Sequence, residues 1–176
     1  GQDCAEVMAE HGHEVSGYDI NPFESDSITQ VETIEELVKD KEYVFVSVPT
    51  PHDPAYDGST PAMHLEPKDF DYTIAKSVIE EANTYMNDSQ SIILISTVMP
   101  GTIRNQIIPL VTNTNFVYNP YLIAMGTIRW DMVNPEMIMI GTEDGSETGL
   151  AKDLKEFYDS FMENDPRTII GTWEEI

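Results

Sequence analysis

The chain has 176 residues, of which 32 are acidic and 9 basic, so its formal net charge at pH 7 is −23. Such a surface repels phosphate backbones and anionic lipids, so we expect neither a nucleic-acid nor a membrane partner. No apolar run approaches the roughly 20 residues that span a bilayer, and no signal peptide is visible at the start. A single cysteine, Cys4, leaves no internal disulfide. These features favour a cytoplasmic protein with one substantial core.

Strand patterns and amphipathic helix patterns alternate along the chain. Helices are predicted over residues 3–10, 33–39, 68–86, 101–111 and 146–162. Strands are predicted over residues 13–20, 28–31, 43–48, 91–97, 115–118, 137–140 and 167–170. Strands that are almost continuously apolar and alternate with helices are typical of a parallel sheet covered on both faces. The sequence therefore predicts an α/β, Rossmann-like fold with a mainly parallel, doubly wound sheet.

The first predicted helix begins next to Gly1, and the first predicted strand carries Asp19 near its end. A glycine at a helix start, followed about 20 residues later by an acid at a strand end, forms the second half of a dinucleotide-binding unit. Asp19 would then bind the ribose hydroxyls of NAD. The first strand of such a unit would come before Gly1, so we expect a sheet that lacks its first strand. The alternative interpretation is that Asp19 is a simple cap, the more frequent role of an acid at a strand end, and that Gly1 is a residue left from expression. The half-motif leaves both interpretations open.

The third predicted strand ends abruptly in a loop, VPTPHDPAYDGSTP, that contains four prolines. Proline fixes its own φ and has no backbone donor, so the strand cannot continue there. In open α/β sheets, ligands bind at the carboxyl ends of the strands. The next strand ends in Ser96 and Thr97, whose hydroxyls either cap the following helix or contact a ligand.

Several motifs follow one another in a specific order: Asp19, VPTP at 48–51, DGS at 57–59, STVMPGT at 96–102, NP at 119–120 and NPEMIMIG at 134–141. Together they resemble the N-terminal NAD-binding domain of the UDP-glucose/GDP-mannose dehydrogenase family. The resemblance implies NAD as cofactor and a nucleotide sugar as substrate. Members of this family oxidise the C6 alcohol of the sugar to a carboxylate with two NAD, through a thiohemiacetal and a thioester on a cysteine.

The resemblance also implies roles for individual residues. Thr97 would lie at the NAD and position the hydrolytic water, which makes it the catalytic candidate. The sugar would meet Tyr121, Leu122 and Ile123. The residues expected to bind the cofactor are Gly1, Asp19, Val48, Pro49, Thr50, Ser96 and Thr97. No metal ligands are expected.

The sequence departs from the family pattern in three places. Tyr121 stands where the family has the glutamate of thioester hydrolysis, and Met125 replaces a second glutamate. The segment after Asp19 is short and lacks a nearby Arg or Lys. The chain stops where the family's long central helix begins, so we expect an NAD-binding domain over residues 1–171 and the start of that helix over 172–176. Because the nucleophilic cysteine would lie beyond residue 176, we expect the fragment alone to be inactive.

Two alternatives remain open from the sequence. One is a non-catalytic nucleotide-binding relic, which the residues at 121 and 125 favour. The other is the NAD domain of a β-hydroxyacid dehydrogenase, which shares the half-motif but is not expected to carry VPTP, DGS and STVMPGT together. The missing first strand would leave unpaired strand edges, which favour a homo-oligomer.

Overall fold

The computed structural model describes residues 1–61, 63–124 and 126–176. Its α-helices are α1 (Gln2–Glu10), α2 (Ile34–Val38), α3 (Thr73–Tyr85), α4 (Ile128–Val133) and α5 (Leu150–Asp159). Its strands are β1 (Ser16–Gly17), β2 (Thr29–Gln30), β3 (Tyr43–Val46), β4 (Ser91–Leu94), β5 (Asn115–Tyr118), β6 (Met137–Thr142) and β7 (Arg167–Thr172). Short helical turns occupy η1 (Pro54–Tyr56), η2 (Ile103–Ile107) and η3 (Ile108–Leu110). None of the helices in these ranges is long and apolar enough to cross a membrane.

The strands form two sheets. β1 and β2 make a parallel pair, and the larger sheet has the order β3-β4-β5-β6-β7. Pairing is parallel from β3 to β5 and again between β6 and β7, whereas β5 and β6 are antiparallel and meet at Tyr118 and Gly141. The predicted α/β fold with a mainly parallel sheet is therefore confirmed.

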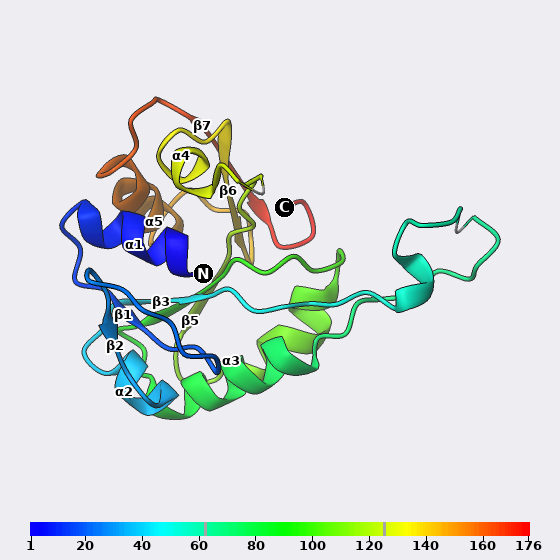
Figure 1. Cartoon of the computed structure of the whole chain (residues 1–176), viewed down its shortest axis with the longest axis horizontal. Helices are drawn as coiled ribbons and strands as arrows, with labels where there is room; N and C mark the ends of the chain where they lie inside the picture. Colours follow the sequence, from blue (N-terminus) through cyan, green and yellow to red (C-terminus); the bar gives the residue numbers. More distant parts are fainter. Residues whose placement is uncertain (62, 125) are drawn as a thin grey trace.

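Side chains of the central strands alternate between two cores, as the two-residue period of a strand requires. On β4, Ile92 and Leu94 face the core that contains α2, α3 and η2, whereas Ile93 faces the core that contains α1, α4 and α5. Figure 1 shows these two groups of helices on opposite faces of the sheet. Because both faces are covered, the sheet is doubly wound, as predicted.

The two sheets are not paired with each other among the described strands. In the Rossmann strand order, β2 and β1 lie on one side of the first strand, and β3, β4 and β5 lie on the other. Among the described strands, β1 pairs only with β2, and β3 pairs only with β4. Strand 13–20 was predicted too long, since only Ser16–Gly17 pairs. We attribute this to pairing on one edge alone, since β2 is the one neighbour of β1 among the described strands.

Three predicted helices differ from the observed ones. The helix predicted over 101–111 is instead the π-helical turn η2 followed by the 3₁₀ turn η3, because Pro109 has no N–H to continue an α-helix. The helix predicted from 146 begins at Leu150, after Gly149 with φ 56°. The helix predicted from 68 begins at Thr73, because Asp71 accepts the Thr73 N–H. The short helix α4 was not predicted.

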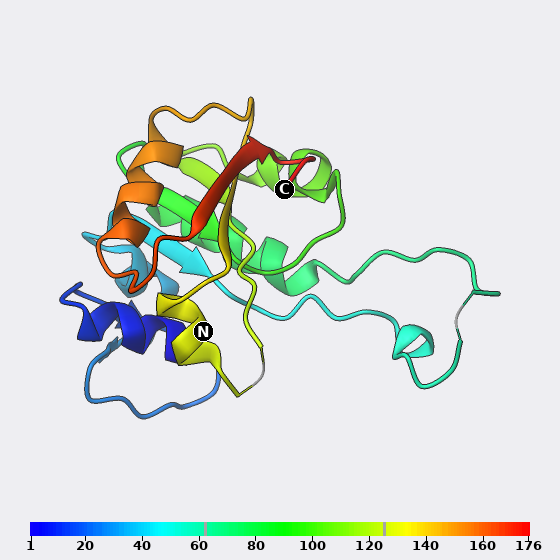
Figure 2. The same ribbon diagram turned by 90° about the horizontal axis from the view of Figure 1, so that it is seen from above.

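The proline-rich segment after β3 projects from the body as an arm, residues 51–70, and returns to α3 (Figures 1 and 2). None of its described residues is buried. The base of the arm is closed by the Asp71 N–H, which donates to the Pro51 carbonyl at 2.8 Å. Farther out, Lys68 pairs with Asp53. The arm is therefore held by contacts within itself, and at its end the half-buried Phe70 packs against the core.

Candidate functional site

The carboxyl ends of β3 and β4 are joined by the side chain of Ser96. The Ile95 N–H, just after β4, donates to the Val46 carbonyl at the end of β3, at 2.9 Å. Ser96 Oγ then accepts the Val48 N–H at 2.8 Å and donates to the Val48 carbonyl at 2.7 Å. Ser96 is buried, with 8% of its surface exposed. Its hydroxyl thus replaces a ladder bond and fixes the point where the VPTP loop leaves the sheet.

Thr50 and Thr97 continue this contact toward the surface. Thr50 Oγ1 donates to the Thr97 carbonyl at 2.7 Å. Pro49 and Thr97 are exposed, whereas Val48 is half-buried. The structure therefore brings together five of the predicted site residues, Val48, Pro49, Thr50, Ser96 and Thr97, at one edge of the sheet. Thr97 is the exposed hydroxyl-bearing residue of this group, and the neighbouring Ser96 is buried beside it.

The start of α1 lies beside the same edge. A Cβ placed on Gly1 would lie 4.0 Å from the Cβ of Ser47, which directly follows β3. No side chain caps the N-terminus of α1. Its first backbone N–H groups therefore remain available to an anion, and the helix dipole favours negative charge there.

Asp19 lies in the loop that follows β1. Its Oδ1 accepts the Asn21 N–H at 2.8 Å, which leaves Oδ2 outside this turn. The same loop returns to α1, where Gln2 Nε2 donates to the Glu24 carbonyl at 2.8 Å. Asp19 is exposed. Asp19 therefore caps the turn that follows β1, as the alternative to a ribose contact required. Its second carboxylate oxygen, Oδ2, is still available to a ligand.

Two tyrosines that sequence analysis did not single out hold the STVMPGT loop. Tyr72 OH accepts the Met99 N–H at 3.0 Å and donates to Asp69. Burial, and next the Asp69 carboxylate, raise the pKa of Tyr72. Tyr118 OH accepts the Val98 N–H at 3.4 Å. The sequence signal for Tyr72 was the pair of aromatic residues in DFDY just before α3, whose rings lie 6.4 Å apart in the structure.

The segment predicted to meet the sugar is divided between core and surface. The Tyr121 ring packs 5.7 Å from that of Tyr158, and its OH donates to the Met132 carbonyl at 3.0 Å. Burial raises the pKa of Tyr121, so its phenol remains protonated at neutral pH. Leu122 and Ile123, in contrast, are exposed. The second departure from the family, Met125, lies outside the described residues.

The NP pair at 119–120 has a structural role. Asn119 is fully buried, its Nδ2 donates to the Met139 carbonyl at 2.7 Å, and its Oδ1 accepts from Tyr158 OH. This bridge ties the end of β5 to β6 and to α5. It thereby sets the direction in which residues 121–123 leave the sheet.

A family model matches residues 23–162, and its description is "UDP-glucose/GDP-mannose dehydrogenase family, NAD binding domain". The chain belongs to this family. The domain matched is the one that binds NAD, so NAD is the cofactor, as predicted. The family consists of NAD-dependent dehydrogenases, and the match decides against the β-hydroxyacid alternative. Gly1 and Asp19 lie outside the matched range.

Solved structures share the fold. A GDP-mannose dehydrogenase from Pseudomonas aeruginosa is 22% identical with a TM-score of 0.79, and a UDP-glucose dehydrogenase from Pyrobaculum islandicum is 22% identical with a TM-score of 0.77. Each comparison covers 99% of this chain but 44% of the other. A UDP-D-ManNAc dehydrogenase from Pyrococcus horikoshii is 19% identical, with a TM-score of 0.73, over 99% of this chain and 46% of the other. No curated protein matches the chain in sequence.

Proposed function

We propose that this chain is the cofactor-binding part of an enzyme that oxidises the C6 alcohol of a nucleotide sugar, of the UDP-glucose or GDP-mannose type, to the uronate. The observation that carries the proposal is the junction of Ser96 with Val48 and of Thr50 with Thr97. It gathers two family motifs, VPTP and STVMPGT, at the strand ends where dinucleotides bind in this fold.

The residues at this edge fit an extended dinucleotide. In the proposal, the uncapped start of α1 binds the pyrophosphate, because its N–H groups compensate for the acidic surface. The free Oδ2 of Asp19 binds the adenosine ribose, and its charge disfavours a 2′-phosphate. Val48, Pro49 and Thr50 line the cofactor. Bound NAD supplies the hydride acceptor.

Thr97 is proposed as the residue that orients water at the sugar. Its side chain is exposed while its carbonyl is held by Thr50, so the hydroxyl is presented from a fixed backbone. A hydroxyl both donates and accepts, and so orients water without a change of charge. Leu122 and Ile123 are proposed to contact the sugar, and Tyr121 to position them from the core.

The covalent step needs a thiolate from elsewhere. Cys4 is buried on α1, and burial raises the pKa of its thiol, so it is not a reactive thiolate. We assign residues 1–171 to the cofactor domain and 172–176 to the start of a helix. In support, the Glu175 carboxylate accepts from both the N–H and Oγ1 of Thr172, at 2.9 and 3.0 Å, and the first of these bonds is the contact from the glutamate back to the N-cap that a capping box contains.

Calorimetric titration with NAD tests the cofactor site. We expect saturable binding that Asp19→Ala weakens about tenfold, the value of one charge-assisted hydrogen bond. The matched control is Asp26→Ala, which removes an exposed carboxylate from the same connection without the proposed contact. NADP should bind more weakly than NAD, and the ratio of their two affinities should be smaller in Asp19→Ala than in the wild type. Equal losses in both variants would remove Asp19 from the site.

Saturation-transfer NMR with UDP-glucose and GDP-mannose, in the presence of NAD, tests the substrate assignment. We expect transfer to the sugar protons of one nucleotide sugar and a loss of this signal in Leu122→Ser. If NAD binds with the expected Asp19 dependence but neither nucleotide sugar does, residues 121–123 do not bind the sugar by themselves, and their assignment to the substrate is wrong.

A further inference from the structure

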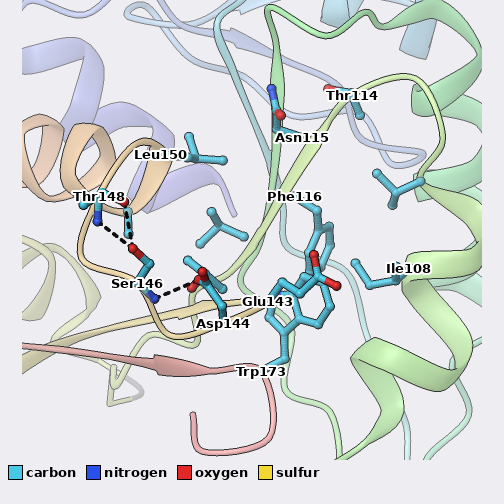
Figure 3. Close-up of a pocket in the computed structure, with 14 residues that line it drawn as sticks. Ile108, Thr114, Asn115, Phe116, Glu143, Asp144, Ser146, Thr148, Leu150 and Trp173 are labelled. Carbon is cyan, nitrogen blue, oxygen red and sulfur yellow. Dashed lines mark hydrogen bonds between the residues drawn. The ribbon is translucent and has the colours of Figure 1, made fainter.

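A cavity, called the second cavity to distinguish it from the proposed cofactor site, lies between β5 and the segment that follows β6. Its volume is about 500 Å³, within the range of ligand pockets. Figure 3 shows Phe116, Trp173 and Ile108 on one side of it, with Asp144, Ser146 and Thr148 on the other. None of these residues belongs to the site proposed above.

One wall of this cavity is an open strand edge. β5 and β6 pair only at Tyr118 and Gly141, and beyond this point they diverge. The N–H groups of Asn115 and Asn119 donate toward β4, to the carbonyls of Gln90 and Leu94. Because alternate residues of a strand direct their N–H and C=O to opposite sides, Phe116 directs both groups away from β4. The pairing of β5 with β6 is at Tyr118 and Gly141, and it gives Phe116 no partner in β6.

Two side chains that line the cavity, those of the buried Trp173 and the half-buried Thr142, each have a buried polar atom without a partner. Among the residues that the structure describes, Trp173 Nε1 and Thr142 Oγ1 are buried and make no hydrogen bond. Trp173 is only 7% exposed. Its ring is held between Phe116, at a centroid distance of 6.1 Å, and Arg104, whose Cζ lies 4.9 Å from the ring centroid. Such a buried donor normally finds a partner, so its position points to an acceptor supplied by a ligand.

The opposite wall is acidic. Glu143 and Asp144 both line the cavity, and Asp144 Oδ1 accepts the Ser146 N–H at 2.9 Å. Arg104 lies 3.8 Å from the Glu143 carboxylate but makes its shorter contact, 2.6 Å, with Glu174. The wall therefore retains negative charge, in a chain whose formal net charge is −23. This charge favours a cationic ligand over an anionic one.

We propose that this cavity binds a short extended peptide segment with a lysine or arginine side chain, contributed by a basic partner protein. The peptide lies along the free edge of β5 and exchanges backbone hydrogen bonds with Phe116. One of its carbonyls accepts the indole N–H of Trp173, and its backbone N–H or a side-chain hydroxyl pairs with Thr142. Its basic side chain lies against Asp144. A second copy of this acidic chain is a poor occupant, because it carries only 9 basic residues.

The probe is the peptide acetyl-Lys-Val-Thr-Val-Lys-amide, titrated into the full chain and followed by amide NMR shifts and calorimetry. We expect saturable shifts centred on Phe116 and on the residues after β6. Replacing both lysines by glutamate should abolish binding, because of the acidic wall. Replacing the central threonine by proline, which has no N–H, should weaken it at least fivefold. In a Trp130→Phe background, Trp173 becomes the sole tryptophan, and its fluorescence should change on binding.

Matched variants separate the cavity from general stability. Thr142→Val and Thr168→Val each remove a buried hydroxyl without a partner, but only Thr142 lines the cavity. Thr142→Val should weaken peptide binding about two- to tenfold, whereas Thr168→Val should leave it unchanged. Trp173→Phe should weaken it by a similar factor. Equal binding of the lysine and glutamate peptides, shifts located elsewhere, or no saturable binding by the lysine peptide would each overturn the proposal. Binding of free N-acetyl-lysine-amide as tight as that of the peptide would also overturn it, since a single residue cannot pair along the strand edge.

Discussion

Ser96→Ala is the most direct test of how the cofactor edge is built. The substitution removes one oxygen from a buried site and keeps the backbone conformation of β4 accessible. It deletes two hydrogen bonds to Val48, of 2.8 and 2.7 Å. A neutral hydrogen bond contributes roughly 0.5–1.5 kcal/mol net, so we expect a loss of about 1–3 kcal/mol in the free energy of unfolding. For a chain of this size, this corresponds to a fall in the thermal midpoint of roughly 2–10 °C.

The assay is urea unfolding followed by circular dichroism, with NAD titration on the same samples. Ser89→Ala is the matched control, because the Ser89 hydroxyl is exposed and bonds only to Asn87 within its own turn. We expect the control to change the unfolding free energy by less than about 0.5 kcal/mol. NAD affinity should fall several-fold in Ser96→Ala, because the VPTP loop loses its anchor. If Ser96→Ala unfolds at the same urea concentration as the wild type, Ser96 does not join the two strands as described here.

Two further predictions concern other parts of the fold. Tyr158→Phe leaves the buried Asn119 Oδ1 without its donor and should lower the unfolding free energy by about 1–3 kcal/mol, whereas Tyr85→Phe, at an exposed position, should have little effect in the same denaturation assay. The Arg104 hydrogen bond lowers the pKa of Glu174 below its ordinary value of 4.5, so this contact should stabilise the fold above about pH 4.5 and be lost as the pH falls through the folded-state pKa; an NMR titration should find the pKa of Glu174 raised in Arg104→Ala, and an unchanged value would contradict the assignment.

Local sequence was a good guide wherever one face of an element is apolar. The boundaries of β5 and the start of β3 were predicted to the residue, because buried strands are short runs of branched and aromatic side chains between polar turns. Prediction was wrong where a single backbone group decides the outcome. Pro109 converts an expected α-helix into π and 3₁₀ turns, and a strand with one neighbour, β1, pairs over two residues rather than eight.

The candidate site shows the same division. The motifs VPTP and STVMPGT were visible in the sequence, and the parallel sheet explained why they should meet. The division of labour within them was not visible, because it depends on which hydroxyl faces inward. The hydroxyl of Ser96 makes both of its hydrogen bonds to the backbone of Val48, while its neighbour Thr97 is exposed. Likewise, the phenol of Tyr121 is directed into the core by Met132, a residue 11 positions away.

The sequence by itself determined the class of fold, the family and the cofactor, because hydrophobic period and ordered motifs are properties of neighbouring residues. Tertiary structure decided which polar atoms were left without partners, since this depends on contacts between segments far apart in the chain. The unpaired indole of Trp173 and the open edge of Phe116 arise only because β5 and β6 diverge after one pair. No local pattern encodes that divergence, and so the second cavity could be found only in the folded chain.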